Sequence, residues 1–102
     1  MLYHSTRSDL SAVDSAQAVL EGLAPDGGLY MPAAMPAFDW KACLKGSSMD
    51  MSTMILSALL PDIPNMEDLV RKAYTGKFAA EDLTPTVPVG EFSVLELFHG
   101  PT

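Results

Sequence analysis

Hydrophobic residues recur at helical spacing in two stretches near the middle of the chain. Between residues 50 and 60 they occupy positions i, i+3, i+4, i+7 and i+8, and Pro61 ends the stretch. The same spacing recurs between residues 66 and 74, after Asn65 as a candidate cap and before Gly76. Only a few residues separate the stretches, so we predict two helices packed as an antiparallel pair. The two stripes consist of Met51, Met54, Ile55, Ala58, Leu59 and of Met66, Leu69, Val70, Ala73, Tyr74.

The stretch between Asp14 and Gly22 predicts a third helix. Asp14 can cap it, Gln17 three residues later can return the bond, and Gly22 ends it. A cap at Ser11 is the alternative, which would start the helix one turn earlier; we favour Asp14. The polar residues 6–9 are expected to form a loop before this helix. Its expected apolar face consists of Ala16, Val19, Leu20 and Leu23.

Short extended segments are predicted towards both ends of the chain. Residues 2–5 alternate apolar and polar side chains, as a strand does. Residues 29–31 follow a turn rich in glycine and form a second short strand. Residues 84–89 contain two prolines, which confine this segment to a sheet edge, and residues 92–98 form the last strand.

A brief helix over residues 40–44, capped by Asp39 and stopped by Gly46, completes the set of predicted elements. The pattern shows no repeat and no internal linker. We therefore predict a single domain over residues 1–102 of the α/β class, with α+β character. It would hold a small sheet of short strands with three or four packed helices.

Composition narrows the range of functions. Hydrophobic residues make up 48% of the chain, as in globular proteins, and the longest apolar run is far too short to span a membrane. The net charge of −7 and only six lysines and arginines argue against a nucleic-acid partner. The lone Cys43 excludes an internal disulfide, and we expect it to be buried. A reduced cytoplasm fits these features.

Few residues suggest chemistry. His4 and His99 are the only imidazoles, too few for a zinc site, and we expect none. His4 lies among apolar residues of a predicted strand, which favours a structural role. His99 adjoins Gly100 at a strand-to-turn corner and is the better candidate for a pocket. Arg7 suits a phosphate or carboxylate, although pairing with an acidic side chain is the stronger expectation.

Three motifs resemble threonine synthases of the longer class, which depend on pyridoxal phosphate (PLP). They are residues 3–7 (Tyr-His-Ser-Thr-Arg), residues 22–32 (Gly-Leu-Ala-Pro-Asp-Gly-Gly-Leu-Tyr-Met-Pro) and residues 96–102 (Glu-Leu-Phe-His-Gly-Pro-Thr). Two positions depart from the pattern: Ser8 replaces a glycine, and Ser15 replaces an aromatic residue in the first helix.

The resemblance implies the amino-terminal domain of an enzyme with the tryptophan-synthase-β-like fold. The complete enzyme would use PLP to convert O-phospho-L-homoserine and water to L-threonine and phosphate, by γ-elimination and β-addition. In this family the lysine that binds PLP follows the last motif, so we expect no catalytic or cofactor-binding residue in this chain and no activity from it alone. The residues expected near the active-site cleft are Glu96, His99, Gly100, Pro101 and Thr102.

The expected partner is the remainder of the enzyme chain, and the uncovered last strand makes self-association a second expectation. A function of another class stays open at this point. A free-standing acidic protein-interaction module, with its acidic face or edge strand as the binding surface, is the alternative.

Overall fold

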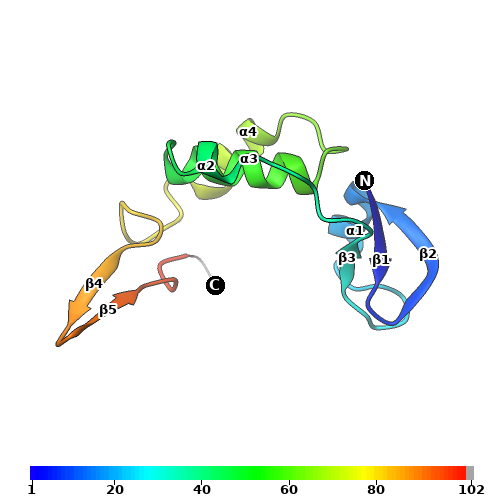
Figure 1. The fold of residues 1–102 in the computed structure, drawn as a ribbon, viewed down its shortest axis with the longest axis horizontal. Coiled ribbons are helices and arrows are strands. Elements are labelled where there is room, and N and C mark those ends of the chain that lie inside the picture. The colour runs from blue at the N-terminus through cyan, green and yellow to red at the C-terminus, as the bar shows by residue number, and fades with distance from the viewer. Residues whose placement is uncertain (101–102) are drawn as a thin grey trace.

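The amino-terminal third of the chain forms an antiparallel sheet with one helix. The computed structural model describes residues 1–100, and of residues 9–11 it describes the backbone only. The sheet has the order β2-β1-β3, with β1 (Leu2–Ser5) between β2 (Ser8–Asp14) and β3 (Tyr30–Pro32). Helix α1 (Ser15–Glu21) begins directly after β2 and packs on β1 and β2. Figure 1 shows this unit in blue and cyan.

Strand β2 corrects the sequence prediction, which expected a loop at residues 6–9. The loop is reduced to a turn at residues 6–7, and a strand over residues 8–14 follows it. This strand pairs with β1 at residue 8 and at residues 12–14, with an irregularity between them, and the local pattern of polar residues does not reveal this pairing. Asp14 is confirmed as the cap of α1, accepting a hydrogen bond from the Gln17 amide at 2.8 Å, and the alternative cap at Ser11 is wrong. The Gln17 side chain does not return the bond but donates to Glu21 at 2.7 Å.

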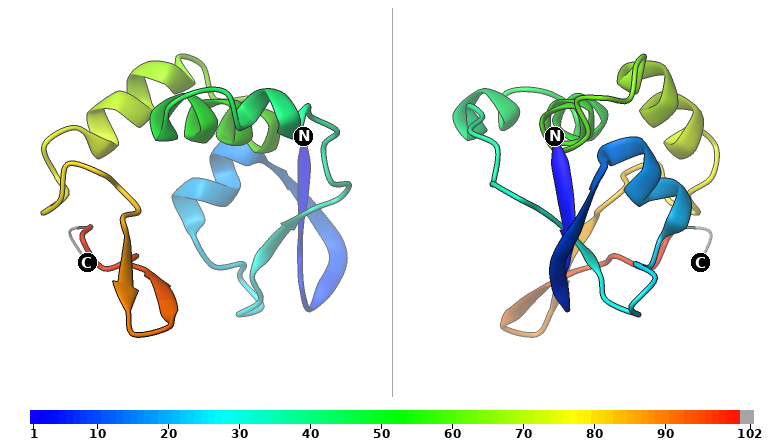
Figure 2. Two further views of the ribbon diagram at one scale, coloured as in Figure 1. Left: turned by 60° about the vertical axis from the view of Figure 1, so that its left-hand side comes forward. Right: turned by 90° about the vertical axis from the view of Figure 1, so that its right-hand side faces the viewer.

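Three helices form the middle of the molecule: α2 (Trp40–Cys43), α3 (Ser48–Leu59) and α4 (Met66–Tyr74). Helix α4 runs back along α3, which confirms the predicted pair (Figures 1 and 2). Helix α3 starts earlier than predicted, because Ser47 and Asp50 form a reciprocal capping box.

The last two strands form a separate hairpin. Strands β4 (Thr86–Val89) and β5 (Phe92–Leu95) pair only with each other, through a turn at residues 90–91. The four helices and short strands agree with the predicted class, but the strands of the two ends do not share one sheet as the sequence suggested. Strand β5 also ends at residue 95, three residues before its predicted end.

The molecule is an arch, in which the first sheet and the hairpin descend from opposite ends of the helical layer (Figures 1 and 2). Its radius of gyration is 16.3 Å, whereas a compact domain of this length has about 13 Å. The buried hydrophobic set is correspondingly small: Tyr3, Ala18, Ala24, Cys43 and Val70. Burial of Cys43 agrees with the sequence prediction.

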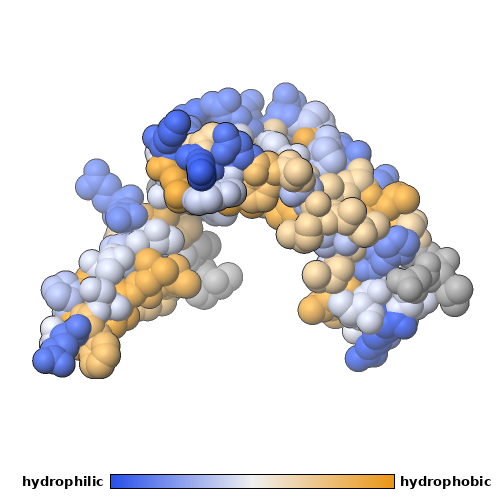
Figure 3. All heavy atoms as spheres, in the orientation of Figure 1, coloured by the Kyte–Doolittle hydropathy of each residue, from blue (hydrophilic) through white to orange (hydrophobic). Residues whose placement is uncertain are grey.

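The expected apolar face of α1 is largely uncovered. Val19 is 55% exposed and Leu20 is 87% exposed, whereas the small residues Ser15 and Ala18 face the sheet. Trp40, the first residue of α2, is 59% exposed. Figure 3 shows hydrophobic side chains at the surface along both arms of the arch. Periodicity located the helices correctly, but within residues 1–100 nothing covers these faces.

Candidate functional site

The segment after β5 brings together two candidate site residues, Glu96 and His99, whose side chains contact each other. His99 Nε2 lies 3.0 Å from Glu96 Oε1, and both side chains are about four-fifths buried, with exposed fractions of 19% and 21%. An ionised carboxylate only accepts hydrogen bonds, so the ring donates from Nε2. In the tautomer that carries its proton on Nε2, the lone pair of the ring is on Nδ1, the nitrogen that does not contact Glu96.

Backbone contacts hold this segment in place. The Ala79 amide donates to the His99 carbonyl at 2.9 Å, and the Glu96 amide donates to the Pro85 carbonyl at 2.9 Å. The rings of Phe98 and His99 lie 4.6 Å apart at a tilt of 39°. The predicted site residues Glu96 and His99 are therefore held together by the strand end and by the segment before β4.

Gly100 completes the described part of this segment. A Cβ added at this position would lie 3.5 Å from the Phe78 ring, which is ordinary van der Waals contact, so the space beside Gly100 would admit a methyl group. Pro101 and Thr102 lie outside the described residues.

A cavity of about 350 Å³ adjoins the segment. It opens between the first turns of α3, the end of α4 and the segment before β4, and Phe78 and Leu97 link it to the Glu96–His99 pair. Its size is within the range of small-molecule pockets. The polar atoms at its wall come from Ser48, Ser52, Tyr74 and Thr84.

The first two sequence motifs meet in a second polar cluster. Asp26 Oδ1 accepts bonds from Ser5 Oγ at 2.6 Å and from the Gly28 amide at 2.9 Å, and these bonds lower the pKa of its carboxyl. Thr6 Oγ1 accepts from the Leu29 amide at 3.0 Å. A Cβ on Gly28 would overlap Ser5 Oγ, so only glycine fits there without displacement.

Arg7 lies in this second cluster and not beside His99. Its Nη1 donates to the backbone oxygen of Asp26 at 3.0 Å, and its charge further favours the ionised Asp26 carboxyl. The expected pairing with an acidic side chain is thus replaced by a contact to the main chain of an acidic residue. The first sheet and the segment of His99 are at opposite ends of the arch (Figure 1).

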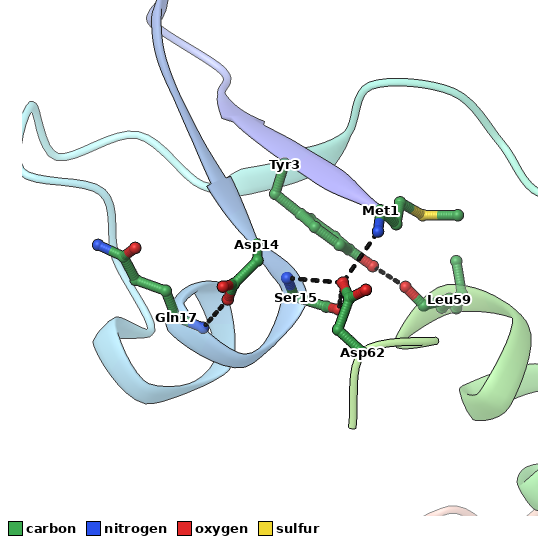
Figure 4. A network of polar contacts seen from close by, with 7 residues as sticks. All are labelled: Met1, Tyr3, Asp14, Ser15, Gln17, Leu59 and Asp62. Atoms are coloured by element: carbon green, nitrogen blue, oxygen red, sulfur yellow. Dashed lines mark hydrogen bonds and ion pairs between the residues drawn. The ribbon is translucent and has the colours of Figure 1, made fainter. Parts of the chain in front are cut away.

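A third polar cluster joins the first sheet to the helical layer (Figure 4). Asp62 Oδ2 accepts from Ser15 Oγ at 2.5 Å and pairs with the amino group of Met1 at 2.9 Å. These contacts hold the pKa of Asp62 at about 2. Tyr3 donates its hydroxyl to the Leu59 carbonyl, and burial, with a smaller contribution from the Asp62 charge, raises the pKa of Tyr3.

Sequence reasoning missed this third cluster, although it contains Ser15, whose side chain is fully buried. The one available signal was the departure at position 15, where the resemblance expects an aromatic residue. Asp62 follows Pro61 in a short loop and carries no pattern of its own. His4 is also unexplained: its Nδ1 is buried and has no hydrogen-bond partner among the described residues.

The four lysines of the chain are all exposed: Lys41, Lys45, Lys72 and Lys77. Among the described side chains, those of residues 1–8 and 12–100, no group of three histidine, cysteine or acidic residues is placed to hold a metal. No helix in the described part of the chain is long and apolar enough to cross a membrane.

Comparison with known proteins identifies the family. A family model described as "Threonine synthase N terminus" matches residues 2–74. This chain belongs to the threonine synthase family. Threonine synthase of Methylobacillus glycogenes is 37% identical over the whole chain, and that of Saccharomyces cerevisiae is 33% identical over 99% of it.

Solved threonine synthases have the same fold. The PLP-bound enzyme of Brucella melitensis matches 99% of this chain with a TM-score of 0.80 and 34% identity. The yeast enzyme matches 98% with a TM-score of 0.80 and 32% identity. The chain covers only 22–24% of the length of these relatives, so it corresponds to the amino-terminal region of a threonine synthase.

Proposed function

We propose that this chain is the amino-terminal part of an active threonine synthase. The complete protein would convert O-phospho-L-homoserine and water to L-threonine and phosphate in the cytoplasm. The observation that supports this most strongly is the match of the fold to a PLP-bound threonine synthase over 99% of the chain. PLP supplies the electron sink for such chemistry, and the complete protein would bind it through residues beyond those described here.

The part of the chain that reaches the cleft is, on this proposal, the segment from Glu96 to Thr102. Glu96 holds the His99 ring by one hydrogen bond, and Nδ1 is then available to accept a proton or a hydrogen bond. The role of these residues in the complete protein is orientation and proton handling, while the covalent chemistry belongs to the cofactor.

The direct test is an assay of the complete protein, encoded by the gene read past residue 102. We expect threonine and phosphate to appear in equal amounts from O-phosphohomoserine, with no product from residues 1–102 alone. Threonine formation by the 102-residue polypeptide would contradict the assignment, as would a complete, folded, PLP-loaded protein without this activity.

The role of His99 has its own test in the complete protein. We expect His99→Asn to lower kcat by about 10²-fold or more, in the range of general acid–base groups. His4→Asn is the matched control, because His4 lies in β1 at the other end of the arch. Equal kcat in the two variants would remove His99 from the proposed site.

The alternative, a free-standing acidic interaction module, has no support in these comparisons, because the matches extend over nearly the whole chain and all point to threonine synthases. Self-association through the last strand is a separate proposal that the exposed β5 favours. Sedimentation of the 102-residue polypeptide at increasing concentration tests it, and a monomer throughout would contradict it.

A further inference from the structure

The hairpin β4–β5 has one edge that is ready to accept another strand. In an antiparallel pair, residues alternate between those whose N–H and C=O face the partner and those whose groups point away. The bond from the Glu96 amide to the Pro85 carbonyl, at 2.9 Å, fixes this alternation. Val94 therefore faces β4, whereas the backbone groups of Ser93 and Leu95 point away from it.

The opposite edge of the hairpin is blocked. Thr86 and Pro88 are the β4 residues opposite Leu95 and Ser93, so their backbone groups point to the outer side of β4. Pro88 has no N–H to donate, and proline is a common way of preventing strand addition. The two edges thus differ: β5 offers both donors and acceptors, and β4 lacks a donor at its centre.

Both faces of the hairpin carry apolar side chains that nothing in residues 1–100 covers. Phe92 is 76% exposed, Leu95 is 56% exposed and Val94 is 42% exposed. One face is entirely apolar and consists of Val87, Val89, Phe92 and Val94, as the register places them on the same side. The opposite face is mixed, because it carries Leu95 and Pro88 beside Thr86 and Ser93. An isolated two-stranded hairpin is only marginally stable, so the apolar face needs a covering layer.

The arrangement of the chain indicates what covers this hairpin. The family model of the amino-terminal region ends at residue 74, before the hairpin begins. The matched threonine synthase structures extend over more than three-quarters of their length beyond the part that this chain covers. Strand β5 leads directly into the segment of Glu96 and His99, which the proposed function places at the cleft formed with that remainder.

We infer that β5 is the nucleus of a larger sheet, whose next strand comes from the part of the same protein that follows residue 102. That strand pairs with the free backbone groups of Ser93 and Leu95, and its domain covers the apolar faces of the hairpin. The inference rests on the proposed function for the identity of the partner. On this inference the hairpin β4–β5 belongs structurally to the domain formed by the residues after 102, although the hairpin comes before that domain in the sequence.

Hydrogen exchange in the complete protein tests the pairing. We expect the amides of Ser93 and Leu95 to exchange at least about 100-fold more slowly than unprotected amides, like the amide of Val94 that bonds to β4. Rapid exchange at Ser93 and Leu95, together with slow exchange at Val94, would overturn the inference. Protection of both amides that disappears on dilution would also overturn it, in favour of a second copy of the chain.

A pair of proline variants of the complete protein tests which edge is used. Ser93→Pro removes an outward N–H of β5, and Thr86→Pro removes an outward N–H of β4 without affecting the bonds between the two strands. We expect Ser93→Pro to lower Tm by about 5 °C or more, or to prevent folding, and Thr86→Pro to change Tm by less than about 2 °C. Equal losses in the two variants would overturn the assignment to the β5 edge.

These measurements separate the inference from the proposed function. Neither exchange nor Tm depends on substrate or turnover. A complete protein that protects Ser93 and Leu95 at all concentrations but does not make threonine would support the strand pairing and contradict the enzymatic proposal. An active threonine synthase with a freely exchanging β5 edge would do the reverse.

Discussion

The first sheet and the hairpin β4–β5 are both short and antiparallel, but they differ in the polar contacts that the rest of the chain makes with them. The first sheet is surrounded by polar bonds from the chain itself: Asp26 closes its turn on Ser5, and Asp62 reaches Ser15 behind it. The hairpin has no such support, and every residue of β5 is exposed. The comparison shows that polar side chains fix the first sheet to its neighbours, while the hairpin depends on its own backbone pairing, and that apolar side chains stay exposed at both ends of the arch.

The largest effect on stability is expected when a side chain fills the space beside Gly28. In Gly28→Ala the new methyl group would overlap Ser5 Oγ and approach Asp26 Oδ1, so the polar cluster must open. We expect a loss of about 2–3 kcal/mol in the free energy of unfolding, measured by urea denaturation. Gly22→Ala is the control, since it meets no atom within 4 Å and should cost only about 1 kcal/mol for its positive φ. Equal losses would show that the first sheet does not depend on this cluster.

A somewhat smaller loss is expected at the junction behind the first sheet. Ser15→Ala removes the hydroxyl that donates to Asp62 and should lower the free energy of unfolding by about 1–2 kcal/mol. Ser57→Ala, at an exposed position of α3, is the matched control and should change stability by less than about 0.5 kcal/mol. If Ser15→Ala is as neutral as its control, the buried hydroxyl does not contribute to the junction.

Acid should weaken the same junction. The pKa of Asp62 is lowered to about 2 by its bonds to Ser15 and to the chain's amino group, compared with an ordinary value of 3.8. A lowered pKa stabilises the fold above pH 4, and this contribution is lost as the pH falls from about 4 to about 2. We expect the Tm of Asp62→Asn to depend less on pH over this window than that of the unaltered chain. Parallel Tm profiles for both proteins would contradict this expectation.

The smallest effect is expected in the hairpin when the 102-residue polypeptide is studied alone. Phe92 is 76% exposed, so Phe92→Ser should change the free energy of unfolding by less than about 0.5 kcal/mol. In the complete protein the same change should cost about 2 kcal/mol, because the inferred sheet buries the ring. Urea denaturation of both forms provides the measurement, and a neutral result in the complete protein would leave the hairpin as a surface feature.

The sequence predicted the local elements well because caps, prolines and glycines act over a few residues. Asp14, Asp39 and Asn65 mark helix starts as expected, although Asn65 is in a left-handed conformation and makes no side-chain cap bond. The prediction failed where pairing depends on distant residues. Strand β2 carries polar residues that alone suggest a loop, and only its partner β1 makes it a strand.

The candidate site was predicted in part. The terminal motif singled out Glu96 and His99, and the structure shows that they contact each other. The motif did not indicate the neighbouring cavity, because Ser52 and Tyr74 reach its wall from two different helices. The predicted apolar face of α1 is exposed at Val19 and Leu20, whereas the last strand is uncovered as the sequence suggested.

The junction at Asp62 affects the relative orientation of the first sheet and the helical layer, in addition to the stability of the fold. Apolar surfaces in contact can slide past each other at little cost, but hydrogen bonds lose strength when their angles change. Directional hydrogen bonds of Asp62, Ser15 and Tyr3 connect the first sheet to the end of α3. The orientation of the first sheet relative to the helical layer is thus held by hydrogen bonds at this one corner.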